Sequence, residues 1–281
     1  MGASSSPPVS RLQLGRELRR LREGAQVSRE TAAAELECGI SKISKVETGK
    51  ATLRAGEVKV LLDLYGVTER DAVQRLARDA RKRSLYRVPD WAKTYVGMEA
   101  DAAEIRTYET ELIPGLLQTR AYAREVFRTA VPNQDPREVE RLVEARSDRQ
   151  RRLTAEDAPL LWAIISEAVI RRVVDDHEVM HHQLDHLATA AGDTYPNVTI
   201  QVLPFSAGAH AAMGSSFVHL RLTDPPDAET VYLEDLTSAD YVVRPSNVAR
   251  YLWAFGTLAS AALSPEKSAL MIKQASEDLL P

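Results

Sequence analysis

The first eighty residues divide into short, helix-sized segments, and this feature limits the possible folds more than any other. Leu14, Leu18 and Leu21 recur at three- and four-residue spacing, as on one face of a helix, and Gly24 ends the pattern. Comparable patterns predict further helices over 28–36, 40–48, 55–64 and from Thr68 onward. Helices this short are marginal in isolation, so the segment must pack as a compact five-helix bundle.

Residues typical of helix starts support these boundaries. Ser10 with Gln13 predicts a capping box for the first helix, and Ser28 predicts the cap of the second. Thr68 with Asp71 has the same spacing and is expected to open the fifth helix.

A different pattern follows, in which strands and helices alternate. Runs typical of strands cover 159–165, 198–203, 216–222 and 230–235. Helical patterns cover 118–130, 136–153, 175–191, 246–262 and 265–279. The sequence therefore predicts an α+β protein with a disordered tail over 1–9, a helical domain over 10–83, a linker over 84–94 and a mixed α/β domain over 95–281.

Charge is distributed unevenly between these parts. Residues 1–88 carry 18 Lys and Arg against 11 Asp and Glu, a net charge of +7, whereas the whole chain has a net charge of -4. The remainder therefore carries -11. A basic domain followed by an acidic one predicts that the first binds a polyanion and that the second does not.

The opening residues and the cysteine content indicate the compartment. The stretch MGASSSPPV has neither the basic start nor the apolar core of a signal peptide, and no apolar run approaches the ~18 residues of a membrane span. Cys38 is the single cysteine, so no internal disulfide can form. These features predict a cytoplasmic protein.

The segment GISKISKVETGK, residues 39–50, predicts a helix with two different faces. Ile43 and Val46 can pack inward, whereas Ser41, Lys42 and Lys45 fall on the other side. The preceding predicted helix, SRETAAAEL, ends only a few residues earlier. Two short helices joined by a tight turn, with an outward row of Ser and Lys, indicate a helix-turn-helix that reads the major groove of DNA.

Leu14 to Val67 also resembles the lambda-repressor-like (XRE) helix-turn-helix family, whose first three helices match LRRLRE, SRETAAAEL and ISKVETGK. The resemblance implies that Glu47 pairs with Arg22 as a structural bridge. It also implies contacts with base edges or phosphates from the following residues: Ser28, Arg29, Gly39, Ile40, Ser41, Lys42, Ser44, Lys45, Lys50 and Arg54.

Three residues depart from the pattern of that family. Glu37 stands where the turn glycine is usual, and Gly39 stands where a serine cap is usual. Ile40 occupies a position often filled by a base-reading glutamine and can touch a thymine methyl group instead. The departures are compatible with the fold and bear on the operator sequence.

A histidine-rich helix invites a metal interpretation. Two pairs have the four-residue spacing that can hold zinc: His177 with His181, and His182 with His186. The predicted buried stripe of the same helix consists of Met180, Leu184, Leu187 and Ala191. That stripe directs Glu178, His182 and His186 to solvent, so we expect a solvated face and neither a metal nor another cofactor.

Other reactive residues favour structural roles. Cys38 lies where an apolar residue is expected, which favours a core filler over a redox switch. Ser215 and Ser216, near His210 and His219, lack both a nucleophile elbow and a third partner. With no phosphate-binding glycine motif either, the sequence predicts that the chain is not an enzyme.

Residues 95–275 resemble the domain of unknown function that follows an XRE helix-turn-helix in many regulators of high-GC, spore-forming bacteria. The matching stretches are YETELIPGLLQTRAYA (108–123), IQVLPFSAGAH (200–210), EAVIRR, VYLED and SPEKS. The resemblance implies an antitoxin-like regulator of development or secondary metabolism, encoded beside a small partner protein.

These observations predict a sequence-specific DNA-binding transcriptional regulator, with a repressor-like first domain, located on the nucleoid. A single helix-turn-helix has a small footprint, so we expect a homodimer reading two half-sites about one DNA turn apart. The second domain is expected to support the dimer and to bind the small partner protein. Two alternatives remain open: a small-molecule sensor with a pocket lined by Trp162, Phe205 or Tyr232, and an enzyme tethered to DNA through the histidine cluster.

Overall fold

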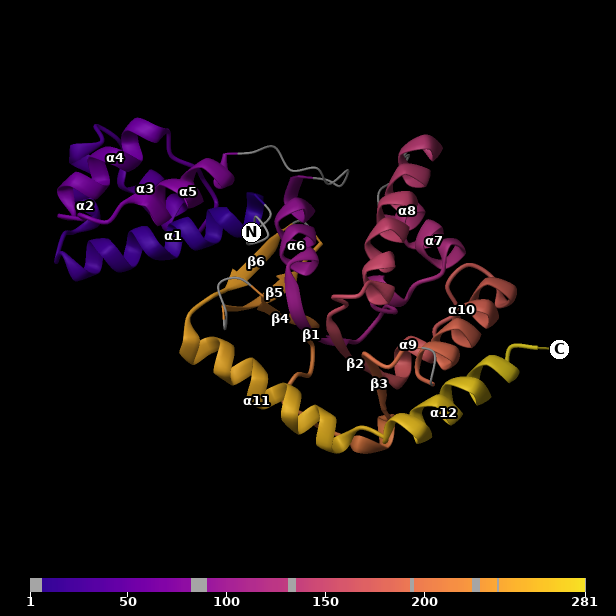
Figure 1. Cartoon of the computed structure of the whole chain (residues 1–281). Helices are drawn as coiled ribbons and strands as arrows, with labels where there is room; N and C mark the ends of the chain where they lie inside the picture. Colours follow the sequence, from indigo (N-terminus) through magenta and orange to yellow (C-terminus); the bar gives the residue numbers. More distant parts are fainter. Residues whose placement is uncertain are drawn as a thin grey trace. The chain divides into compact units, whose positions relative to one another are not determined.

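The computed structural model describes residues 7–81, 90–130, 135–192, 195–223, 228–236 and 238–280 (Figure 1). Its contacts divide the chain into two units, Met1–Asp101 and Ala102–Pro281, and each has a hydrophobic core of its own. The described part of the first unit is helical, and the second is built on a sheet. The predicted α+β class is confirmed.

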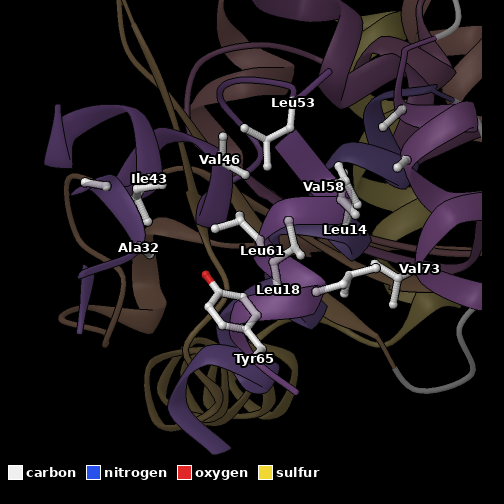
Figure 2. Close-up of a cluster of buried hydrophobic side chains, with 14 residues drawn as sticks. Leu14, Leu18, Ala32, Ile43, Val46, Leu53, Val58, Leu61, Tyr65 and Val73 are labelled. Carbon is white, nitrogen blue, oxygen red and sulfur yellow. The ribbon is translucent and has the colours of Figure 1, made fainter. Parts of the chain in front are cut away.

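The first unit is a bundle of short helices. In chain order they are α1 (Pro7–Gly24), α2 (Arg29–Glu35), α3 (Ile40–Glu47), α4 (Ala55–Leu64), α5 (Asp71–Ala80) and α6 (Asp90–Ala100). Figure 2 shows the shared core, in which Leu14 and Leu18 of α1 meet Leu61 of α4, and Ile43 of α3 lies beside Ala32 of α2. No helix completes this core alone, so the five helices α1 to α5 stabilise one another.

The helix ends follow several of the sequence signals. The Ser28 Oγ caps α2 by accepting the Thr31 N–H at 3.0 Å. Gly49 and Gly66 follow α3 and α4 with φ angles of +73° and +66°, a left-handed conformation that glycine adopts without strain. The predicted ends of α3 and α4 are therefore confirmed.

The start of α1 differs from the prediction. The helix begins at Pro7, so residues 7–9 are helical rather than part of a tail, and residues 1–6 lie outside the described chain. Proline is favourable in a first helical turn because its fixed φ suits a helix and its missing N–H is not needed there. Ser10 is consequently inside the helix, buried in the bundle, and does not cap it.

Two later boundaries also differ. Arg70 rather than Thr68 precedes α5. Its Nε donates to the Val67 carbonyl at 2.7 Å, which gives that carbonyl in the turn before the helix a hydrogen-bond partner. Residues 90–94, assigned to a linker, belong to α6, because the helix buries Val96 and Met98. The rest of that linker up to residue 89 lies outside the described residues.

Helices α1 and α3 approach each other closely at Gly15. A Cβ atom at this position would lie 2.4 Å from the Val46 carbonyl oxygen, so the end of α3 would have to move. We expect Gly15→Ala to destabilise the first unit by about 1–3 kcal/mol, although alanine is the better helix former. Amide hydrogen exchange in α1 and α3 of the full chain measures the effect.

The matched control for this substitution is Gly56→Ala in α4, where nothing lies within 4 Å of the added Cβ. That change is expected to stabilise the unit by at most ~1 kcal/mol. Equal exchange protection in the two variants would show that the approach at Gly15 does not limit packing.

The described strands of the second unit form a six-stranded sheet with the order β3-β2-β1-β4-β5-β6. The strands are β1 (Ala102–Glu109), β2 (Leu160–Ser166), β3 (Val198–Leu203), β4 (Phe217–Leu222), β5 (Glu229–Glu234) and β6 (Ala239–Val242). Strands β1, β2 and β3 are parallel, and β4 runs antiparallel between β1 and β5. Strands β1, β2, β3 and β5 therefore end at the same edge, where β4 begins; we call it the carboxyl edge.

Helices cover this sheet. They are α7 (Arg120–Ala130), α8 (Pro136–Gln150), α9 (Glu167–Arg171), α10 (His177–Ala190), α11 (Pro245–Ala261) and α12 (Pro265–Glu277), with 3-10 turns η1 (Gly115–Leu117), η2 (Arg151–Thr154) and η3 (Phe205–Ala207). Phe255 and Leu258 of α11 pack with Tyr108 and Ile164 of the sheet. Helix α12 packs against α10 and β3 (Figure 1).

The four strands predicted from sequence are present within one or two residues, but β1 and β6 were missed. Strand β1 carries Glu104 and Arg106, which weaken its hydrophobic pattern. The Glu104 carboxylate accepts hydrogen bonds from Arg106 at 2.7 Å and from Arg221 of β4 at 3.0 Å, which balances the charges. Strand β6 is a four-residue edge strand, too short for a periodic signal.

Candidate nucleic-acid interface

Helices α2 and α3 are joined by a turn of four residues, 36–39. The Cys38 N–H donates to the Ala33 carbonyl at 2.9 Å, which closes the end of α2. Glu37 adopts a φ of +49° in this turn, a left-handed conformation usually taken by glycine. Cys38 packs against the core of the first unit, as expected of a small apolar filler.

Helix α3 presents two distinct faces. Ile43 and Val46 are 1% and 2% exposed and point into the core (Figure 2). On the other side Ser41 and Lys45 are exposed, and Ile40 keeps 47% of its surface accessible. This side therefore presents an apolar side chain from Ile40, a hydroxyl group from Ser41 and an ammonium group from Lys45 to a ligand.

A buried ion cluster fixes α3 to the two preceding helices. The Glu47 carboxylate accepts from Arg22 Nε at 2.6 Å and from Arg22 Nη2 at 3.2 Å. It also accepts from Arg29 Nε at 2.8 Å. Arg22 Nη1 donates to the Val27 carbonyl at 2.9 Å, so the bridge reaches the entry to α2. Burial, reinforced by the Glu47 charge, raises the pKa of Tyr65 to about 12.

The Arg22–Glu47 pair implied by the resemblance is thus present. Arg29, implied to approach a phosphate, is instead engaged by Glu47 while 38% of its side chain stays exposed. The Arg29 guanidinium links α2 to α3, and only the exposed part of this side chain is accessible to DNA.

Lys42 is directed toward α4 rather than along the outward row. Its Nζ donates to Glu57 Oε1 at 2.5 Å, and the other Glu57 oxygen accepts the Arg54 N–H at 2.7 Å. The hydrogen bond from Lys42 is the main reason why the pKa of Glu57 is lowered. Glu57 was not identified from the sequence, although the Arg54-x-x-Glu57 spacing is that of a helix-capping carboxylate.

The remaining predicted contact residues lie on α3 and its flanks. Gly39 is the exposed N-cap residue of α3, and Ser44 is half-buried, its carbonyl accepting from Thr48 Oγ1 at 2.9 Å. Lys50 and Arg54 are exposed on the segment that leads into α4. The structure therefore gathers residues 39–54 around one helix, with Ser28 at the start of the neighbouring helix.

A shallow depression of about 360 Å³ lies beside α2 and is lined by Arg19, Arg22, Glu23, Ser28, Arg29 and Glu30. Its three arginines already bind Glu23 and Glu47. This pairing makes the depression a poor anion site despite its basic residues.

The histidine-rich helix of the second unit is used for packing. Met180, Leu184 and Leu187 are buried as predicted, although Ala190 rather than Ala191 completes the stripe. The His181 Nδ1 lies 2.7 Å from Ser276 Oγ of α12, and that hydroxyl donates to Asp185 Oδ1 at 2.7 Å. Within the described ranges, no group of three His, Cys, Asp or Glu residues could hold a metal.

His186 corrects one detail of this helix. It was expected to face solvent but is half-buried, and burial lowers its pKa. A residue not considered from sequence, Gln183, is fully buried: its Oε1 accepts the Thr119 N–H at 2.7 Å and its Nε2 donates to the Leu117 carbonyl at 2.9 Å.

The three residues expected to line a sensor pocket, Trp162, Phe205 and Tyr232, lie apart from one another. In the sheet register Trp162 pairs with Arg106, Arg106 with His219, and His219 with Val231, so Trp162 and Val231 point to the same face. Tyr232 follows Val231 in β5 and therefore points to the opposite face. Phe205 is 63% exposed at the carboxyl edge. The three side chains therefore do not line one cavity.

The serine and histidine residues near β4 have separate partners. Ser216 Oγ lies 3.0 Å from Thr110 Oγ1, and His210 Nε2 lies 3.3 Å from the Tyr108 hydroxyl. His219 is buried on β4 beside Glu229 at 3.3 Å. These contacts do not assemble a nucleophile, a base and an orienting carboxylate.

The buried bridge, the turn and the exposed face of α3 define a helix-turn-helix domain, the fold of DNA-binding regulators. Residues 13–76 match the family model described as a helix-turn-helix domain. Residues 92–274 match the model described as a domain of unknown function (DUF5753), and the chain belongs to that family. No curated protein and no solved structure matches the chain. Over the described residues, no helix is both long and apolar enough to cross a bilayer.

Proposed function

We propose that the chain is a sequence-specific transcriptional regulator of the lambda-repressor-like (XRE) type that reads its operator with the exposed face of α3. The observation that carries this proposal is the separation of faces on α3: Ile43 and Val46 are committed to the core, whereas Ile40, Ser41 and Lys45 are free of it. A helix held this way can enter the major groove without disturbing the domain.

The side chains divide the work of binding. Lys45 supplies an ammonium group for guanine or phosphate, Ser41 a hydroxyl, and Ile40 an apolar contact for a thymine methyl group. Lys50 and Arg54 lie on the flank where the DNA backbone would pass. Lys42 acts mainly through Glu57, as a link between α3 and α4.

The test is a set of anisotropy titrations with an operator fragment selected from genomic DNA. Lys45→Ala is expected to cost about 1–3 kcal/mol of binding free energy, and Lys42→Ala less, because Lys42 is already bound to Glu57. If Lys45 contacts phosphate alone, the loss is uniform across sequences and the salt slope falls by ~0.9.

Lys59→Ala is the matched control, since Lys59 is an exposed lysine of α4 outside the interface residues named above. It is expected to leave operator affinity nearly unchanged. A loss for Lys59→Ala equal to that for Lys45→Ala would mean that only the general basic charge of the unit binds DNA.

The proposal includes a homodimer on two half-sites and an acidic second unit that supports the dimer and binds a small regulatory partner protein, as in antitoxin-like control of development or secondary metabolism. The support is the small footprint of one helix-turn-helix and the opposite charges of the two units. Sedimentation of the chain alone and on its operator tests the dimer, and a monomer in both would contradict it. Operator affinity that saturating partner leaves unchanged would contradict the regulation.

The same proposal assigns the protein no catalytic activity and places it on the nucleoid in the cytoplasm. It is supported by the ways in which the reactive side chains of the second unit are engaged in packing, as His181 is by Ser276.

A further inference from the structure

Three polar residues form a row at the carboxyl edge of the sheet. Tyr108 pairs with Phe217 and Val218 pairs with Tyr232, so the next positions in register are Glu109, Ser216 and Glu234. Residues in register on neighbouring strands point to the same face, and neighbouring strands lie ~4.8 Å apart. The two glutamates therefore flank the serine, with backbones roughly 10 Å apart.

Hydroxyl groups hold both carboxylates in place. Thr107 Oγ1 donates to Glu109 Oε1 at 3.2 Å, and the Tyr232 hydroxyl donates to Glu234 Oε2 at 3.1 Å. The negative charge of Glu234 adds to the burial that raises the pKa of the Glu109 carboxyl group. A cationic side chain between them would relieve this repulsion.

Exposed apolar side chains surround the row. The loops that leave the ends of β1, β3 and β5, and the one that leads into β4, carry Leu112, Phe205, Met213 and Leu236. Their exposed fractions are 38%, 63%, 67% and 92% respectively. Several large apolar side chains at one edge of a domain are typical of an interaction surface.

Contacts between the loops make this edge a continuous surface. The Phe205 N–H donates to Glu167 Oε2 at 2.9 Å, which ties the end of β3 to the end of β2. Arg172 binds Glu111 at 2.5 Å, and Thr110 Oγ1 lies 3.0 Å from Ser216 Oγ. The sequence motifs at 108–123 and 200–210 thus meet at one place, together with the end of β5.

The surface is acidic. Its carboxylates are Glu109, Glu111, Glu167, Glu234 and Asp235, and two of its arginines, Arg171 and Arg172, already bind Glu167 and Glu111. The whole unit from residue 102 onward carries 17 Lys and Arg against 26 Asp and Glu, a net charge of -9. A partner that matches this edge must be basic as well as apolar.

We propose that the carboxyl edge is the docking surface for a basic amphipathic segment of a small partner protein. Its apolar side covers Phe205, Met213 and Leu236, and one of its Lys or Arg side chains enters between Glu109 and Glu234. Four strand spacings separate β3 from β5, about 19 Å, which a helix of roughly 13 residues spans. The inference rests on the proposed function only in taking a protein as the regulatory partner.

Fluorescence anisotropy of labelled synthetic peptides with the full chain tests this surface at physiological salt. The probe is a 14-residue helical peptide with one leucine face and one lysine face; the comparison peptides replace lysine by glutamate or leucine by serine. The Leu/Lys peptide is expected to bind at least tenfold more tightly than the others. The triple variant F205S/M213S/L236S and the double variant E109Q/E234Q are each expected to weaken it at least tenfold.

Trp253→Ser is the control, because Trp253 is a large apolar side chain, 64% exposed, that belongs to α11 and not to the loops of the carboxyl edge. Equal weakening by this variant, or equal binding of the glutamate peptide, would overturn the proposal. So would a change from dimer to monomer in the triple variant, since the edge would then hold a second copy of the chain. Operator affinity, measured separately, distinguishes a failure here from a failure of the DNA-binding function.

Discussion

Replacing Glu47 with alanine is expected to destabilise the first unit by about 3–5 kcal/mol, because the change leaves the buried Arg22 without its closest counter-ion. Arg22 and Glu47 side chains are only 8% and 3% exposed, so water cannot replace the lost carboxylate. The partners that remain to Arg22 are the uncharged Val27 carbonyl and Glu23, whose carboxylate lies 3.4 Å away on a side chain that is 52% exposed. Faster amide exchange in α1, α2 and α3 of the full chain measures the loss, and operator binding falls with it.

Two variants distinguish the buried charge from a general loss of contacts. Glu23→Ala removes a surface ion pair with Arg19, 2.8 Å long and about half exposed on both sides, together with a longer contact of 3.4 Å to Arg22. Because Glu47 stays in place, this change is expected to cost at most ~1 kcal/mol. Replacing the buried pair together, as Arg22→Met with Glu47→Leu, is expected to restore much of the stability, since neither charge is then left alone. A Glu47→Ala variant no less stable than the Glu23→Ala variant would show that the bridge does not hold the bundle together.

The two faces of α3 could be predicted from the sequence because they follow from helical periodicity alone. Ile43 and Val46 are three residues apart on one side, and no distant residue is needed to place them in the core. The partner of Lys42 could not be predicted in this way. Its contact with Glu57 depends on how α4 packs against α3, and periodicity carries no information about packing between helices.

The second unit shows the same limit more strongly. Four strands could be predicted because their β-branched runs are apolar, whereas β1 escaped prediction because Glu104 and Arg106 interrupt its pattern. One of the two central strands of the sheet is therefore absent from the sequence-based description. Without it, no register could bring Glu109 beside Ser216 and Glu234, which lie more than a hundred residues away in the chain.

Glu109 is expected to make the stability of the second unit depend on pH. Burial raises the pKa of its carboxyl group to about 7, reinforced by the negative charge of Glu234 and opposed by hydrogen bonds from Thr107 and Ser216. Tyr122 of α7 also faces this carboxyl group. The folded state therefore holds the Glu109 proton more tightly than the unfolded state, in which the pKa of this carboxyl group is near 4.5. The stabilisation of the folded state by this tighter proton binding is complete below pH 4.5 and is lost as the pH rises through 7.

Glu109→Gln should remove this dependence because glutamine stays neutral at every pH. Near pH 8 the variant is expected to be more stable than the wild type by up to ~3 kcal/mol, a maximum because Glu109 keeps some contact with water. Near pH 4.5 the difference should vanish. Urea unfolding of the full chain at both pH values, followed by tryptophan fluorescence, measures it.

The control is Glu111→Gln, two residues further along, where the carboxylate lies on the surface beside Arg172 with 63% of its side chain exposed. A change of at most ~1 kcal/mol is expected there at either pH. Suppose that Glu109→Gln gains no stability relative to wild type between pH 4.5 and 8. The Glu109 carboxyl group is then already solvated or paired in the folded protein. The carboxyl edge would in that case lack the uncompensated charge that a cationic partner residue is proposed to relieve.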